Sequence, residues 1–261
     1  MELLIFICVG IFTGLSAGLL GIGGGLVSVP AMVLLLPYFN VPDVAVMHMA
    51  VATSLALIIP TSLMSAYGHY LQNAIIWSWV YRFIPGLVLG SIIGAYFVTV
   101  SDREILQTIF SIFLILIAGH MLWGKQPAIN KSPSVNHFFP SSAIGFISSL
   151  LGVGGGTMTV PYLMWRGLAL PKAIGSSAAC GFPIAIAGSL VFLLNPVIQT
   201  ADVKGGLGMF YWPAFVGILI GALVFAPVGA KLTHRINVVI LKRIFIVVLL
   251  LVAFELLTTS L

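Results

Sequence analysis

Residues 14–30 read Gly-Leu-Ser-Ala-Gly-Leu-Leu-Gly-Ile-Gly-Gly-Gly-Leu-Val-Ser-Val-Pro, which places glycines at Gly21, Gly23, Gly24 and Gly25. The sequence around these glycines is apolar and typical of a membrane helix. Glycine loosens a helix and exposes backbone N–H groups, which must find partners inside a bilayer. Non-helical backbone occurs at membrane depth only where it is buried in protein or lines a cavity. The stretch therefore predicts a helix break at a buried place.

The stretch occurs a second time, at residues 145–161, where Gly152, Gly154, Gly155 and Gly156 take the equivalent positions. Further correspondences follow in the same order: residues 50–54 with 173–177, Pro60 with Pro183, and Gly86-x-x-x-Gly90 with Gly217-x-x-x-Gly221. Ordered correspondences of this kind indicate an internal duplication. We expect two repeats, 1–123 and 141–261, joined by a polar cytoplasmic linker at 124–140.

The composition is that of a membrane protein. The 261 residues are 60% hydrophobic and 7% charged, with a mean hydropathy of +1.18, whereas about a quarter of the residues of a soluble domain are charged. The first apolar run has no basic flank or cleavage site, which predicts a retained helix rather than a signal peptide. The fold expected is all-α, polytopic, with Gly-rich broken helices.

Helix length and loop charge predict the topology. The run 3–36 would be about 51 Å long as one helix, against a hydrocarbon core of roughly 30 Å, so each Gly-rich stretch reads as the tip of a re-entrant hairpin followed by about three transmembrane helices. This arrangement places nine Lys and Arg residues on one side and two on the other, as the positive-inside rule favours, whereas full crossings give seven against four. It makes the repeats inverted, with both termini outside. The nine are Arg82, Lys125, Lys131, Arg166, Lys172, Lys231, Arg235, Lys242 and Arg243, and the two are Arg103 and Lys204.

Helices that start at the two tips, near Leu26 and Thr157, would direct free N–H groups and positive dipole ends toward the protein centre, which favours an anion. The alternative is that the glycines only allow close helix packing. The neighbouring hydroxyls could donate to substrate oxygens or cap backbone freed by proline. These hydroxyls belong to Thr53, Ser54, Ser176 and Ser177.

Ionisable residues in membrane segments are functional candidates. His48 is a candidate proton carrier or a hydrogen-bonded structural residue, and Arg82 is an interfacial anchor or an anion guide. The same two readings apply to Arg166 and Lys172. Pro60 and Pro183 are candidate hinges. The Gly86 and Gly217 motifs are typical of helix contacts.

Other classes of protein lack their signatures here. No Gly-x-Ser-x-Gly, His-Glu-x-x-His or phosphate-binding loop occurs, so we expect neither an enzyme nor a motor. Cys8 and Cys180 lack metal-ligand spacing, which predicts no disulfide, no metal and no cofactor. The net charge of +5 comes without a basic run interleaved with aromatics, so we expect no nucleic-acid partner.

The paired Gly-x-Gly-Gly-Gly-x-x-x-Val-Pro stretches, together with residues 50–54 and 172–177, resemble the sulfite exporter TauE/SafE family. The resemblance spans nearly the whole chain and implies an inner-membrane permease for sulfite, sulfonates or other small organic anions. One departure is that the first repeat has no counterpart of Lys172 and carries His48 in that region.

These observations predict a secondary transporter that works by alternating access, with a small anion, the lipid bilayer and protons as its partners. An uncoupled anion channel and a non-transporting membrane assembly protein are the alternatives. The small-x-x-x-small helices could face their own bundle or a second protomer, which leaves a homodimer open.

Overall fold

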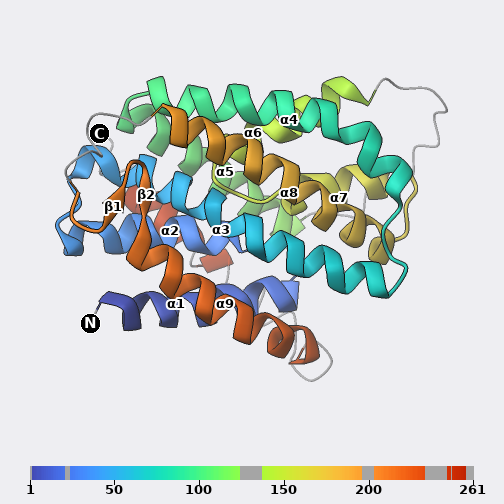
Figure 1. Ribbon diagram of the computed structural model, residues 1–261, viewed down its shortest axis with the longest axis horizontal. Helices are drawn as coiled ribbons and strands as arrows, with labels where there is room; N and C mark the ends of the chain where they lie inside the picture. Colours follow the sequence, from blue (N-terminus) through green and yellow to red (C-terminus); the bar gives the residue numbers. More distant parts are fainter. Residues whose placement is uncertain are drawn as a thin grey trace.

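The computed structural model describes residues 2–20, 24–123, 137–195, 203–232, 246, 247 and 249–256, which form a bundle of α-helices with one small hairpin (Figure 1). The prediction of an all-α architecture is confirmed. The two-residue strands of the hairpin have no counterpart in the sequence analysis. The elements are α1 (Glu2–Leu20), α2 (Gly25–Leu35), the 3-10 helix η1 (Leu36–Phe39), α3 (Asp43–Leu71), α4 (Trp77–Val100), α5 (Arg103–Trp123), α6 (Phe138–Leu150), α7 (Gly156–Trp165), α8 (Leu170–Leu194), β1 (Gly206–Leu207), β2 (Phe210–Tyr211) and α9 (Trp212–Leu232).

Both Gly-rich stretches interrupt a helix, as predicted. α1 ends at Leu20 and α2 begins at Gly25, while α6 ends at Leu150 and α7 begins at Gly156. The second break has a clear local cause, because Gly152 takes a φ of +62°, the left-handed conformation that glycine adopts without strain. The N–H groups of Gly152 and Val153 donate back to the carbonyls of the last turn of α6, which is the Schellman pattern.

The expected linker at 124–140 lies mostly outside the described residues. α6 begins at Phe138, within that range. Residues 233–245 are also outside the described part, so the final apolar segment is described only at 246, 247 and 249–256.

The two halves of the chain interlock by exchanging helices. α1, from the first half, packs along α9 from the second, and α6, from the second half, packs along α4 from the first. Figure 1 shows these pairs at opposite edges of the bundle, with α3 and α8 in contact between them. The first half supplies α1, α2, α3 and α4, and the second half supplies α6, α7, α8 and α9, with a short second helix and a long third helix in each series. The opposite orientation of the halves across a membrane stays a prediction.

Close packing of the exchanged pairs depends on glycine. A Cβ built on Gly86 or Gly90 would overlap the backbone of α6, and a Cβ built on Gly217 or Gly221 would overlap α1. The interpretation of both Gly-x-x-x-Gly motifs as helix contacts is therefore confirmed.

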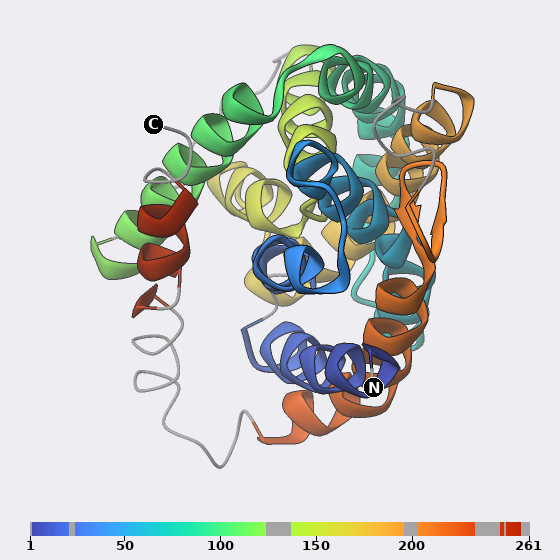
Figure 2. The same cartoon turned by 90° about the vertical axis from the view of Figure 1, so that its left-hand side faces the viewer.

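Four of the described helices are long and apolar enough to cross a membrane: α3, α4, α5 and α8. The outward faces of the bundle carry large apolar side chains. Examples are Leu116 on α5, which is 65% exposed, and Leu190 on α8, which is 50% exposed. Figure 2, viewed along the bundle, shows the short helix α2 near the middle, between α1 and α3, and most of its side chains are buried.

Candidate functional site

The two glycine tips meet inside the bundle. A Cβ built on Gly25, the first residue of α2, would lie 2.6 Å from the carbonyl oxygen of Gly152 and 2.8 Å from the Cα of Val153. A Cβ built on Gly152 would lie 2.9 Å from the carbonyl oxygen of Val51 on α3. Segments more than a hundred residues apart are thus in backbone contact, which only glycine permits at this distance.

Two hydrogen-bonded hydroxyls connect helices α2 and α3 of the first half to the glycine tip of the second half. Ser54 on α3 donates to the carbonyl oxygen of Gly152 at 2.7 Å, and the hydroxyls of Ser54 and Ser28 are 2.8 Å apart. Because the Ser54 proton is used on Gly152, Ser28 donates to Ser54. Both serines are fully buried. The backbone carbonyl at the second-half tip is therefore satisfied by the first half.

The equivalent hydroxyls of the second half lack such partners. Thr159 on α7 takes the position of Ser28, and Ser177 on α8 takes the position of Ser54. Both are buried, and neither side-chain oxygen has a hydrogen-bond partner in the part of the chain that the structure describes. Among the described residues, these equivalent positions therefore differ in their hydrogen bonding, and Gly21, which takes the position of Gly152, lies outside that part of the chain.

Thr53 and Ser176, which also take equivalent positions, hold the ends of helices. The Thr53 hydroxyl accepts from the backbone N–H of Tyr211, just before α9, at 2.9 Å, and the Ser176 hydroxyl accepts from the N–H of Ile76, just before α4, at 2.9 Å. Each bond joins a long helix of one half to the start of a helix of the other half. In this structure these two hydroxyls are structural.

The remaining tip residues lie as follows. Gly24 precedes α2 and Gly155 precedes α7, each at the N-cap position, Leu26 is fully buried in the core, and Gly154 and Thr157 lie next to the start of α7. Gly21 and Gly23 are outside the described residues.

The two candidate hinge prolines lie within continuous helices. α3 runs through Pro60 and α8 runs through Pro183. The Thr61 hydroxyl donates to the carbonyl of Leu57 at 2.8 Å, and the Ser62 hydroxyl donates to that of Ile59 at 3.1 Å. Hydroxyls near a proline kink stabilise carbonyls that the kink exposes.

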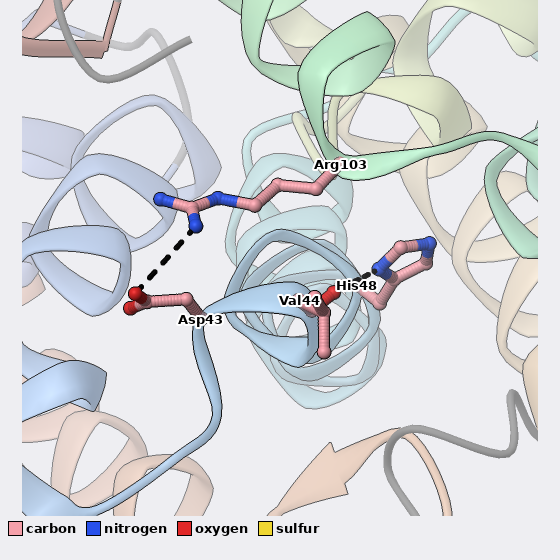
Figure 3. Close-up of polar contacts among 4 residues, drawn as sticks. All are labelled: Asp43, Val44, His48 and Arg103. Carbon is pink, nitrogen blue, oxygen red and sulfur yellow. Dashed lines mark hydrogen bonds and ion pairs between the residues drawn. The ribbon is translucent and has the colours of Figure 1, made fainter.

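His48 lies at a helix junction. Its Nδ1 is 3.1 Å from the carbonyl oxygen of Val44, and its Nε2 is 3.1 Å from that of Ser101, just after α4. Figure 3 shows that Arg103, at the start of α5, extends toward Asp43, the first residue of α3, with an N–O distance of 3.7 Å. The His48 hydrogen bond and the Asp43–Arg103 ion pair hold the first turns of α3 against the turn between α4 and α5.

Arg82 and Arg166 come together at the far end of α7, about 15 Å from its glycine tip by helical rise. Burial lowers the pKa of His137, and the charges of Arg166 and Arg82 lower it further. The His137 ring lies 3.3 Å from the Tyr162 hydroxyl. Lys172 is exposed in the first turn of α8. The structure thus separates these cations from the tips.

The lowered pKa of His137 predicts weaker folding in acid. Below pH about 6.5 this histidine is protonated in the unfolded chain, whereas in the folded chain its lowered pKa keeps it neutral to lower pH. The contribution of His137 to the free energy of unfolding therefore falls as the pH drops. We expect the melting temperature of the wild type relative to His137→Gln, measured in detergent, to decrease from pH 7.5 to pH 5.5. A constant difference across this range would contradict the prediction.

Removing the Ser54 hydroxyl is expected to destabilise the fold. Ser54→Ala leaves the Gly152 carbonyl without its donor and leaves the Ser28 hydroxyl only the carbonyl of Gly25 at 3.5 Å, at a cost of about 1–3 kcal/mol. Thermal unfolding in detergent measures this cost. Thr99→Ala is a matched control, because Thr99 donates to the carbonyl of Tyr96 on an exposed surface. Equal melting temperatures for the two variants would contradict the prediction.

The sequence analysis did not single out Ser28 and Thr159. A signal was present, because a hydroxyl residue follows the last glycine of each stretch at the same spacing. It also gave no indication of His137 and Tyr162, whose proximity arises only when α6 and α7 pack.

The comparisons with known proteins bear on the whole chain. The family model for "Sulfite exporter TauE/SafE" matches residues 6–256. The chain belongs to the TauE/SafE family. Its fold is that of a polytopic membrane protein, and it is a membrane transporter, a permease of the TauE/SafE type; the family is a transporter family and not an enzyme class.

Relatives of this TauE/SafE protein come from distant organisms. A probable membrane transporter protein of Haemophilus influenzae is 36% identical over 254 residues and covers 96% of each chain. One from Methanocaldococcus jannaschii is 30% identical over 241 residues, covering 89% of this chain and 85% of its own. YunE of Bacillus subtilis, also named a probable membrane transporter protein, is 27% identical over 271 residues, covering 95% and 96%. No solved structure matches.

Proposed function

We propose that this TauE/SafE protein is a secondary transporter that binds a small oxyanion where the two glycine tips meet. The observation that carries the proposal is the contact of Gly25 with Gly152 and Val153, which brings the starts of α2 and α7 to the centre of the bundle. The first N–H groups of a helix have no partner within the helix, and the helix dipole favours negative charge there.

The chemistry of this place suits an anion held without a formal countercharge. The tips carry glycine, apolar and hydroxyl residues, whereas Arg82 and Arg166 are at the other end of α7. Sulfite, a sulfonate or a carboxylate spreads its charge over several oxygens, each of which can accept from a backbone N–H or a hydroxyl. The sulfur-containing class is supported by the printed name of the family and is a proposal for this chain.

Transport would require the interlocked halves to move. α1 packs on α9 and α4 packs on α6, so the two exchanged pairs can act as units that shift relative to α3 and α8. We place the halves in opposite orientations across the inner membrane, with both termini outside, which is the arrangement of inverted-repeat transporters that alternate access around a central site. Pro60 and Pro183 would serve as bending points in the two central helices.

Flux of radiolabelled sulfite and of a sulfonate into proteoliposomes tests the proposal, with and without an imposed pH gradient. Accumulation against a concentration gradient only when the pH gradient is present is expected and indicates proton coupling. Flux that merely equilibrates would favour a channel or uniporter, and no flux of any sulfur anion or carboxylate would overturn the proposed substrate class.

A further inference from the structure

Two pairs of hydroxyls at equivalent positions of the tips differ in their hydrogen bonding, and the buried Thr13 hydroxyl beside Gly24 is also unpaired among the described residues. Ser28 and Ser54 bond to each other and to Gly152. Thr159 and Ser177, at the equivalent positions, are 0% and 1% exposed, and their oxygens have no partner among the described residues. An unpaired hydroxyl in a protein interior is costly, so most such groups in folded proteins are bonded to something. Each unpaired hydroxyl of this pair therefore needs a physical explanation.

The Thr159 hydroxyl lies near the start of α7, and Ser177 lies on α8, which packs along α7. A Cβ built on Gly155, the N-cap residue, would lie 3.2 Å from the Thr159 Oγ1, so that oxygen faces the first turn of its own helix. The same Cβ would lie 2.9 Å from the Cδ1 of Ile184 on α8. Ser177 lies two helical turns before Ile184, on the same face of α8 and about 10 Å away along the helix axis. α7 packs along α8.

We propose that Thr159 and Ser177 are the side-chain donors to the transported oxyanion, and that Ser28 and Ser54 are a structural brace without contact to it. The proposal rests on the function proposed above and makes that site asymmetric. The hydroxyls of Thr159 and Ser177 and the first N–H groups of α7 have no acceptor among the described contacts of the tip. A small sulfonate, sulfite or carboxylate supplies the acceptor oxygens.

The asymmetry follows from the different roles of the two tips. The first-half hydroxyls use their protons on the carbonyl of Gly152, whose left-handed conformation turns the chain between α6 and α7. Holding that carbonyl keeps α7 at the centre of the bundle, with its N-terminus available. The brace thus fixes the tip that binds, and the binding hydroxyls stay unpaired because nothing within the described chain needs them.

Equivalent positions provide matched variants of the full-length protein in detergent. Thr159→Val and Ser177→Ala remove the proposed donors, and Ser28→Ala and Ser54→Ala remove the brace. Binding of methanesulfonate and of sulfite is measured by calorimetry, and the melting temperature is measured without ligand.

The two pairs are expected to give opposite results. Thr159→Val and Ser177→Ala should each weaken binding about tenfold to a hundredfold, as expected for a lost hydrogen bond to a charged group, without lowering the melting temperature. Thr159→Ser, which keeps the hydroxyl, should restore binding to within about threefold of the wild type. Ser28→Ala and Ser54→Ala should lower the melting temperature and change the dissociation constant less than about threefold.

The outcomes separate this inference from the function on which it rests. If the wild type binds and transports the anion but Thr159→Val and Ser177→Ala bind as well as it does, the asymmetric assignment alone is overturned. Equal losses in all four variants would show that both halves bind and would also overturn it. If Thr159→Val and Ser177→Ala lose oxyanion affinity in sodium buffer but not in potassium buffer, the two hydroxyls bind a cation, and the assignment of these hydroxyls as donors to the anion is overturned. A wild type that binds no oxyanion overturns the proposed function together with this inference.

Discussion

Gly25→Val is expected to abolish anion flux in proteoliposomes. The Cβ of any larger residue at this position would lie 2.6 Å from the carbonyl oxygen of Gly152 and 2.8 Å from the Cα of Val153, which are both backbone atoms. Backbone cannot rotate aside as a side chain can, so the two tips must separate and the starts of α2 and α7 lose their mutual position. Transport of the same anion by wild type and variant, at matched protein amounts, measures the effect.

Two further glycine variants make this test specific. Gly68→Ala on α3 is the control, because nothing lies within 4 Å of a Cβ built there and alanine favours the helix. Gly24→Ala should reduce flux less than Gly25→Val, since its Cβ would meet the methyl group of Thr13 rather than backbone. Wild-type flux in Gly25→Val would remove the tip contact from the mechanism.

Gly90→Leu is expected to lower the melting temperature in detergent by roughly 10 °C, from overpacking of about 3 kcal/mol. A Cβ at Gly90 would overlap the carbonyl of Ser142 and lie 2.8 Å from the backbone nitrogen of Phe146, both on α6. Because α4 and α6 come from different halves, the variant separates the halves where they interlock. Differential scanning fluorimetry of purified protein measures the shift.

The neighbouring position supplies the control for this packing effect. Leu89 lies next to Gly90 on α4 and is 44% exposed, so Leu89→Ile should change the melting temperature by no more than about 2 °C. A similar small shift for Gly90→Leu would mean that α4 and α6 tolerate separation and that the exchanged pairing contributes little to stability.

The sequence by itself determined the kind of fold and the places where the helices break. Its apolar composition leaves too few charged residues for a soluble surface, and clustered glycines lower helix stability at Gly24–Gly25 and Gly154–Gly156 whatever surrounds them. The paired Gly-x-x-x-Gly motifs likewise predicted helix contacts, because removing side chains at one-turn spacing leaves a groove that only a neighbouring helix fills. These are local properties of the chain, and the structure confirms them.

Only the tertiary structure decided which groups are still available at the centre. Thr53, Ser54, Ser176 and Ser177 look alike in sequence, yet three of them bond to backbone groups of the opposite half, whereas the Ser177 hydroxyl has no partner among the described residues. A hydroxyl serves as donor or acceptor to whichever group lies nearby, and here that group lies 98, 100 or 158 residues away along the chain. The packing of α3 and α8 against segments of the opposite half decides these encounters, and with them which hydroxyls remain unpaired among the described residues.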